Sequence, residues 1–109
     1  MKEDFLKNWD TQLKKGLLPL FVLQALRNKE CYGYELIQEL KSAAGIDISE
    51  GTIYPLLIRL MKEELLHYKW VEQPSGIPRK YYSISQEGKR CLTEMKKSLE
   101  TTHSKIRKL

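Results

Sequence analysis

The residues best suited to chemistry in this sequence are hydroxyl-bearing and cationic side chains in two short segments, residues 49–62 and 79–80. They are Ser49, Thr52, Tyr54, Arg59 and Lys62 in the first segment, and Arg79 and Lys80 in the second. A guanidinium can bridge the two acceptors of a guanine, an ammonium group is attracted to phosphate, and a hydroxyl can donate to either. Both segments therefore predict contacts with nucleic acid.

No other group of residues has the spacing of a catalytic or metal site. Cys31 and Cys91 are far apart and lack the pairing of a redox dithiol, so we expect both to be reduced and partly buried. His67 and His103 have no partner at the spacing of metal ligands. The sequence also lacks a glycine-rich phosphate loop and a nucleophile with a neighbouring base. We therefore expect no enzymatic activity, no metal and no other cofactor.

The net charge favours an anionic partner. The chain has 109 residues, of which 19 are lysine or arginine and 14 are aspartate or glutamate, so its formal net charge is +5. The excess lies in residues 79–109, with nine cations and three anions, whereas residues 1–78 carry a net charge of −1. Such an excess suits nucleic acid or an anionic membrane surface, although a modest excess on a helix can also be a solvated face.

Length and composition predict one cytoplasmic domain over residues 1–109. A chain of this length has room for one hydrophobic core, and 41% hydrophobic and 30% charged residues are ordinary for a globular fold. No apolar run approaches the roughly 18 residues that cross a bilayer. The charged amino terminus lacks the apolar stretch of a secretory signal, so we expect the chain to stay in the cell.

Apolar spacing predicts helices in the first half of the chain. Four apolar residues share one face of a helix over residues 1–15: Phe5, Leu6, Trp9 and Leu13. We expect Gly16 to end or bend this helix. A second helix follows over about residues 17–27, with Pro19 tolerated in its first turn because that position has no intrahelical donor to lose.

Two shorter helices follow. The first covers residues 33–44 and is followed by Gly45, which suits the left-handed position beyond a helix end. The second begins between Ser49 and Thr52, either of which could cap it, and carries an apolar stripe. Pro55 requires either a start near Thr52 or a distorted first turn, because its ring clashes with the carbonyl four residues earlier. The stripe consists of Ile53, Leu56, Leu57 and Leu60.

After Leu65 the apolar period shortens towards two, which predicts a β-hairpin around a loop at residues 73–78. The helical period returns at about Gln86. Three helices closed by a hairpin are the arrangement of a winged helix-turn-helix. We therefore expect a mainly α fold with a small β-hairpin, divided into an N-terminal helix (1–15), a winged helix-turn-helix core (16–85) and a long C-terminal dimerisation helix (86–109).

The C-terminal helix has a narrow apolar seam. Its members are Leu92, Met95, Leu99 and Ile106. So thin a stripe cannot be buried inside one small domain, so we expect these residues to pack against a second copy of the chain.

The two cationic segments also have a plainer interpretation. With the apolar stripe buried, 100° per residue places Thr52, Arg59 and Lys62 on the opposite face, with Tyr54 at its edge. This face could be an ordinary solvated helix surface. The hairpin cations could serve only to keep an exposed strand from aggregating.

Several motifs, taken in order, resemble the PadR family of bacterial transcriptional regulators. Residues 32–36 read YGYEL, residues 49–56 read SEGTIYPL, and residues 78–85 read PRKYYSIS, followed by Gly88. The resemblance spans most of the chain. It is closest to the short members of the family, which have a single C-terminal helix.

This resemblance implies a homodimeric winged-helix repressor that binds double-stranded DNA at inverted-repeat operators and responds to small aromatic or lipophilic effectors. It places Gly33, Tyr34 and Glu35 at the start of the helix before the recognition helix. It also places Arg59 at the basic position of the recognition helix. The residues that match the opening of this helix are Ser49, Gly51, Thr52, Tyr54 and Pro55. Those that match the returning strand of the wing are Arg79, Lys80, Tyr81 and Tyr82.

Glu64 departs from the family pattern, which usually has a glycine before the apolar pair that opens the wing. Either the turn there is capped differently or the helix is longer. The angle of the wing depends on which of these two arrangements forms.

Trp9 is the candidate for effector binding, together with Phe5 and Met95. The resemblance implies that planar ligands enter the dimer interface between aromatic side chains. Plain packing is the alternative, because aromatic residues at helical spacing usually serve a core. A winged-helix protein can also act as a protein adaptor or an RNA binder, so fold alone does not decide the function.

Overall fold

The computed structural model describes residues 2–109; Met1, with which the predicted first helix begins, lies outside the described residues. The elements are α1 Lys2–Asn28, β1 Cys31–Tyr32, α2 Gly33–Ala44, α3 Glu50–Lys62, β2 Leu66–Val71, β3 Arg79–Ile84 and α4 Gln86–Lys108. This confirms the expected class, mainly α with a small antiparallel sheet. Within residues 2–109, no helix combines the length and the apolar character needed to cross a membrane.

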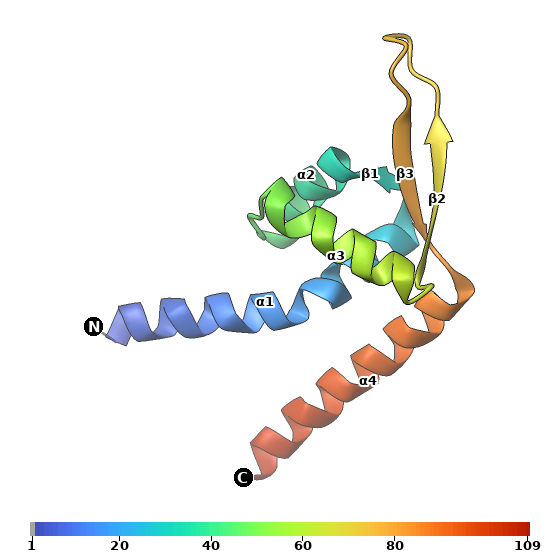
Figure 1. Ribbon diagram of the computed structural model, residues 1–109. Helices are drawn as coiled ribbons and strands as arrows, with labels where there is room; N and C mark the ends of the chain where they lie inside the picture. The colour runs from blue at the N-terminus through green and yellow to red at the C-terminus, as the bar shows by residue number, and fades with distance from the viewer. Residues whose placement is uncertain (1) are drawn as a thin grey trace.

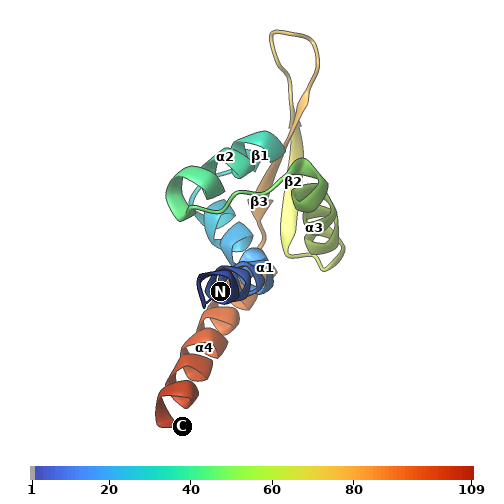
Figure 2. The same cartoon turned by 90° about the vertical axis from the view of Figure 1, so that its left-hand side faces the viewer.

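Three arms project from a small core (Figure 1). The β2–β3 hairpin leaves the core on one side, and the first part of α1 and most of α4 leave it on the other. Figure 2, a view turned by 90°, shows the hairpin and α4 pointing in opposite directions. The molecule therefore has elongated extents of 55 × 33 × 22 Å.

α1 is one continuous helix, so the prediction of two helices separated at Gly16 is wrong. A glycine inside a helix costs about 1 kcal/mol relative to alanine, and the burial of the later part of α1 outweighs that cost. The buried residues are Leu18, Val22, Leu23 and Leu26. The expected change of direction is present: in Figure 2 the first part of α1 is seen end-on while the later part runs up towards α2. Pro19, inside the helix, lacks a donor and is a usual cause of such a bend.

The core draws on every helix and on the sheet. Its buried residues include Leu23, Leu36, Ile53, Leu57, Leu66, Tyr82 and Leu92. Cys31 is also part of it, and burial raises the pKa of the Cys31 thiol to about 11, so this side chain is a neutral apolar group at neutral pH. Both cysteines are free thiols, and Cys91 is half-buried on α4.

The sheet has three antiparallel strands in the order β1-β3-β2. The predicted hairpin is formed by β2 and β3, with Leu66 opposite Ile84 and Val71 opposite Arg79. β1 was not predicted from the sequence, because two residues are too short to show a period. It pairs with Tyr81 and Tyr82 and thereby joins the start of α2 to the base of the hairpin.

Candidate nucleic-acid interface

α2 and α3 form the predicted helix-turn-helix. α2 ends at Gly45, whose φ of 67° lies in the left-handed region that glycine occupies without a Cβ penalty. Ser49 precedes α3, and its carbonyl accepts hydrogen bonds from the backbone N–H groups of Thr52 (3.1 Å) and Ile53 (3.0 Å). The Ser49 hydroxyl caps no helix amide; it lies 3.4 Å from the Thr52 hydroxyl instead. Ser49 therefore occupies the N-cap position, one of the two predicted, but its side chain does not cap the helix.

α3 has one buried face and one open face, as the apolar stripe predicts. The buried residues are Ile53, Leu56, Leu57 and Leu60. On the open side Ser49, Thr52, Arg59 and Lys62 are all exposed. Pro55 lies inside the helix, which begins at Glu50 and not at Thr52. The structure therefore brings four of the predicted contact residues together along one accessible side of α3.

Tyr54 is only partly exposed, because its ring lies against Gly33 at the start of α2. A Cβ atom at position 33 would collide with the hydroxyl end of that ring. The close approach of the Tyr54 ring therefore explains why residue 33 is a glycine. Tyr82 lies nearby: burial, and secondarily Tyr54, raises the pKa of the Tyr82 phenol. Tyr54 is thus fixed in position, with part of its surface open to solvent.

The two hairpin cations lie on opposite faces of β3. Successive residues of a strand point to opposite sides, so Lys80 shares a face with Tyr82 and with its cross-strand partner Trp70. The Lys80 ammonium is 4.1 Å from the centroid of the Tyr68 ring. The Arg79 guanidinium instead lies 4.4 Å over the ring of Tyr32. Both cations were predicted to contact DNA; their side chains lie over rings on opposite faces of β3, and both line the hollow between α3 and the hairpin.

A hollow of about 340 Å³ lies between α3 and the hairpin. It is lined by Tyr32, Gly33, Tyr54, Trp70, Arg79, Lys80 and Tyr82. Trp70, which is 61% exposed, was not singled out from the sequence. The alternation of Leu66, Tyr68 and Trp70 was the available signal, because it places all three on the face that carries Lys80.

Glu64 is the only non-glycine residue with positive φ in the part of the chain that the structure describes (φ 61°). Its N–H donates to the Met61 carbonyl at 2.9 Å, and the Leu65 N–H donates to the Leu60 carbonyl at 3.0 Å. These two bonds are the helix-ending pattern that a glycine usually makes. Glu64 therefore forms the turn that a glycine usually forms at this position, and α3 ends at Lys62 without being extended.

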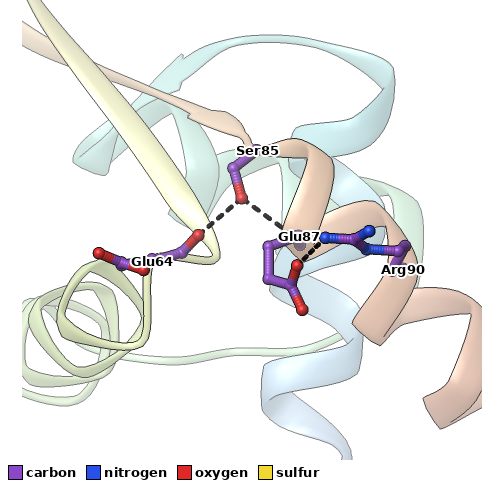
Figure 3. A network of polar contacts seen from close by, with 5 residues as sticks. Glu64, Ser85, Glu87 and Arg90 are labelled. Carbon is purple, nitrogen blue, oxygen red and sulfur yellow. Dashed lines mark hydrogen bonds and ion pairs between the residues drawn. The ribbon is translucent and has the colours of Figure 1, made fainter.

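Ser85 joins the end of α3, the base of the hairpin and the start of α4 (Figure 3). Its buried hydroxyl donates to the Glu64 carbonyl at 2.7 Å and accepts from the Gly88 N–H at 2.9 Å. The Ser85 N–H donates to the Leu65 carbonyl at 3.0 Å. A Cβ atom on Gly88 would collide with that same carbonyl oxygen. Glu87 and Arg90 form an ion pair on the outer side of this joint.

The predicted dimerisation residues fall into two groups. Leu92 is completely buried in the core of its own protomer, so the prediction that it faces a partner is wrong. The prediction relied on the seven-residue spacing of apolar residues along α4, and this spacing does not show where the helix leaves the core. The first turns of α4 pack on the core, whereas the rest of the helix projects from it. Met95 is half-buried against the core, and Leu99 and Ile106 are 41% and 61% exposed.

Trp9 lies on the projecting part of α1, where it is 56% exposed. A cleft of about 720 Å³ runs between α1 and the α2–α3 turn, lined by Lys7, Leu18 and Ile46 among others. Trp9 is not among its lining residues.

Comparison with known proteins agrees with this architecture. Residues 22–94 match the family model described as the transcriptional regulator PadR-like family. A transcriptional regulator of Mycobacterium tuberculosis is 33% identical over 89 residues, covering 82% of this chain and 81% of its own.

Solved structures give the same result. A PadR family transcriptional regulator from Eggerthella lenta is similar with a TM-score of 0.88 at 34% identity, covering 98% of this chain and 93% of its own. A PadR-like regulator from Bacillus cereus has a TM-score of 0.76 at 36% identity, covering 88% of this chain and 93% of its own. These relatives are described as regulators of transcription and not as enzymes, as expected from the sequence. With its helix-turn-helix, its wing and this match over most of its length, the chain belongs to the PadR-like family of transcriptional regulators.

Proposed function

We propose that this protein is a cytoplasmic, sequence-specific regulator that binds double-stranded DNA at an inverted-repeat operator as a homodimer and represses transcription. The observation that carries the proposal is the open side of α3, where Thr52, Arg59 and Lys62 are exposed while the opposite side is buried in the core. A helix fixed by its apolar face and exposing a hydroxyl and two cations is suited to the major groove.

The projecting arms support a dimer. Phe5 and Trp9 on α1 are 72% and 56% exposed, and Leu99 and Ile106 on α4 are also open. Large apolar side chains at helical spacing on two arms that leave the core on the same side favour burial against a second copy. Two recognition helices related by a two-fold axis would then enter successive major grooves, about 34–36 Å apart.

Salt-dependent DNA binding tests the proposal. The measurement is the affinity for duplex DNA from upstream of the protein's own gene at several salt concentrations. Replacing both Arg79 and Lys80 by alanine should weaken binding to any duplex and flatten the salt dependence, by about 0.9 in slope for each phosphate that is no longer neutralised.

The control variant replaces Lys89 and Lys97 by alanine, which removes the same charge from exposed positions on α4. It should leave the slope nearly unchanged. Equal effects of the two double variants would mean that net charge alone governs binding. Affinity that hardly responds to salt would favour the protein-adaptor function. A reporter gene behind the same upstream DNA distinguishes repression from activation.

An effector site at Trp9 belongs to the same proposal. A planar aromatic or lipophilic compound would enter the dimer interface between the α1 and α4 arms, beside Trp9. Adding such compounds should release the operator from the native protein, and this release should be lost in Trp9→Leu. Release of DNA that persists in Trp9→Leu would place the effector site elsewhere.

A further inference from the structure

We propose that Ile58 selects thymine in the operator by packing against the C5-methyl group of that base on the floor of the major groove. This inference rests on the proposed function and goes further, because it names a base that each half-site contains and the residue that reads it. The contact is apolar, which distinguishes it from the charged and hydroxyl-bearing contacts of the same helix.

The side chain of Ile58 takes no part in the packing of its own protomer. It is 55% exposed and lies outside the hydrophobic core that residues 2–109 form. Four other apolar residues of α3 are buried and anchor the helix without it. Single apolar side chains are common on protein surfaces, so the argument depends on where this one lies.

Ile58 lies in the middle of the open side of α3. Spacings of four, three and four residues place four exposed residues along one line of the helix, opposite the buried stripe. This line consists of Gly51, Pro55, Ile58 and Lys62. The side chains of its first three members carry no polar group. Before the end of the helix at Lys62, the line therefore meets the base edges without a side-chain hydrogen bond, and Ile58 reaches furthest from the helix.

Gly51 indicates that a partner surface approaches this line closely. A Cβ atom added at position 51 would meet the Ser49 hydroxyl oxygen at 3.6 Å, an ordinary contact distance, and the backbone there is helical. Neither packing within the protomer nor backbone conformation therefore requires a glycine, which is a poor helix former. A residue without a side chain at the start of α3 leaves room for the bases of the major groove.

The thymine methyl is the group that an apolar side chain can recognise in the major groove. The other three bases present only hydrogen-bond donors and acceptors there, whereas thymine adds a methyl group beside its acceptor. Isoleucine packed against an amino group or a ring nitrogen would leave that group without a partner, which is unfavourable. Packed against a methyl group, it removes apolar surface from water. Ile58 therefore favours thymine over the other bases.

The methyl group and the side chain can be removed separately, which gives a double-mutant cycle. The probe is the duplex that the native protein binds most tightly in a selection from a random pool, with each thymine replaced in turn by deoxyuridine. One position per half-site should weaken binding of the native protein about fourfold for each methyl group removed, as expected for one buried apolar carbon. The same replacement should have no further effect in Ile58→Ala. Ile58→Leu keeps an apolar side chain of the same size and should retain the response.

Ile77→Ala is the matched control, because it truncates the same type of side chain in the loop of the wing, where Ile77 is 74% exposed. This variant should keep the full response to deoxyuridine. If each replacement affects the native protein and Ile58→Ala to the same extent, Ile58 does not read thymine and the inference is overturned, while specific binding and the proposed function stand. If the selection recovers no preferred duplex, the proposed function itself is overturned, and this inference with it.

Discussion

At the scale of single residues, Glu64 shows how a side chain can occupy a position made for glycine. A left-handed conformation costs a residue with a Cβ about 1–2 kcal/mol, and the hydrogen bonds that end α3 maintain it. Replacing Glu64 by glycine removes this cost but adds freedom to the unfolded chain. We expect Glu64→Gly to raise the free energy of unfolding by about 0.5–1 kcal/mol, measured by chemical denaturation.

Glu63 supplies the control for this prediction. It is the preceding residue, also exposed, with an ordinary φ of −80°. Glu63→Gly should lower the free energy of unfolding by about 0.5–1 kcal/mol, because only the entropy of the unfolded state changes. Effects of the same sign in both variants would show that Glu64 is not strained.

At the scale of elements, two glycines inside helices should respond to alanine in opposite directions. Gly16 in α1 has no atom within 4 Å of an added Cβ, so Gly16→Ala should stabilise the protein by about 1 kcal/mol through helix propensity. Gly88 in α4 lies against the Leu65 carbonyl, and Gly88→Ala should destabilise by about 2–3 kcal/mol through overpacking against rigid backbone. Thermal unfolding of both variants measures this difference. A Gly88→Ala protein as stable as the native one would mean that the backbone at Leu65 can shift to accommodate the added methyl group at little cost.

The elements themselves were largely predictable from the sequence, and their exceptions have physical causes. Periodicity predicted α2, α3, the hairpin and α4, because each is long enough to repeat its apolar spacing. It failed at Gly16, where burial of the following residues outweighs a poor helix former. It also failed at Leu92, because a seven-residue spacing does not reveal where a helix leaves the core.

The candidate site was predictable by residue type and less so by geometry. The exposed side of α3 followed from helical spacing, and the structure places Thr52, Arg59 and Lys62 there. The placement of Arg79 and Lys80 on opposite faces of β3 follows from strand alternation, whereas the face that Lys80 shares with Trp70 depends on the register between β2 and β3. β1 and the hollow beside Tyr54 depend on contacts between distant segments, which no local pattern contains.

At the scale of the whole molecule, the projecting arms should determine the oligomeric state. Replacing both Leu99 and Ile106 by glutamate places charges on the exposed apolar side of α4, so we expect monomers in sedimentation velocity and at least a tenfold loss of operator affinity. Thr101→Glu, on an exposed polar position of the same helix, should remain a dimer. A Leu99→Glu/Ile106→Glu protein that still sediments as a dimer would place the interface elsewhere.

Specific DNA binding is tested most directly by a titration of the purified protein against duplex DNA from upstream of its own gene, with unrelated duplex as competitor. We expect saturable, competitor-resistant binding at two protomers per site, with affinity that falls steeply as salt rises. Binding that is weak, equal on both duplexes and without defined stoichiometry would contradict a specific regulator of that site.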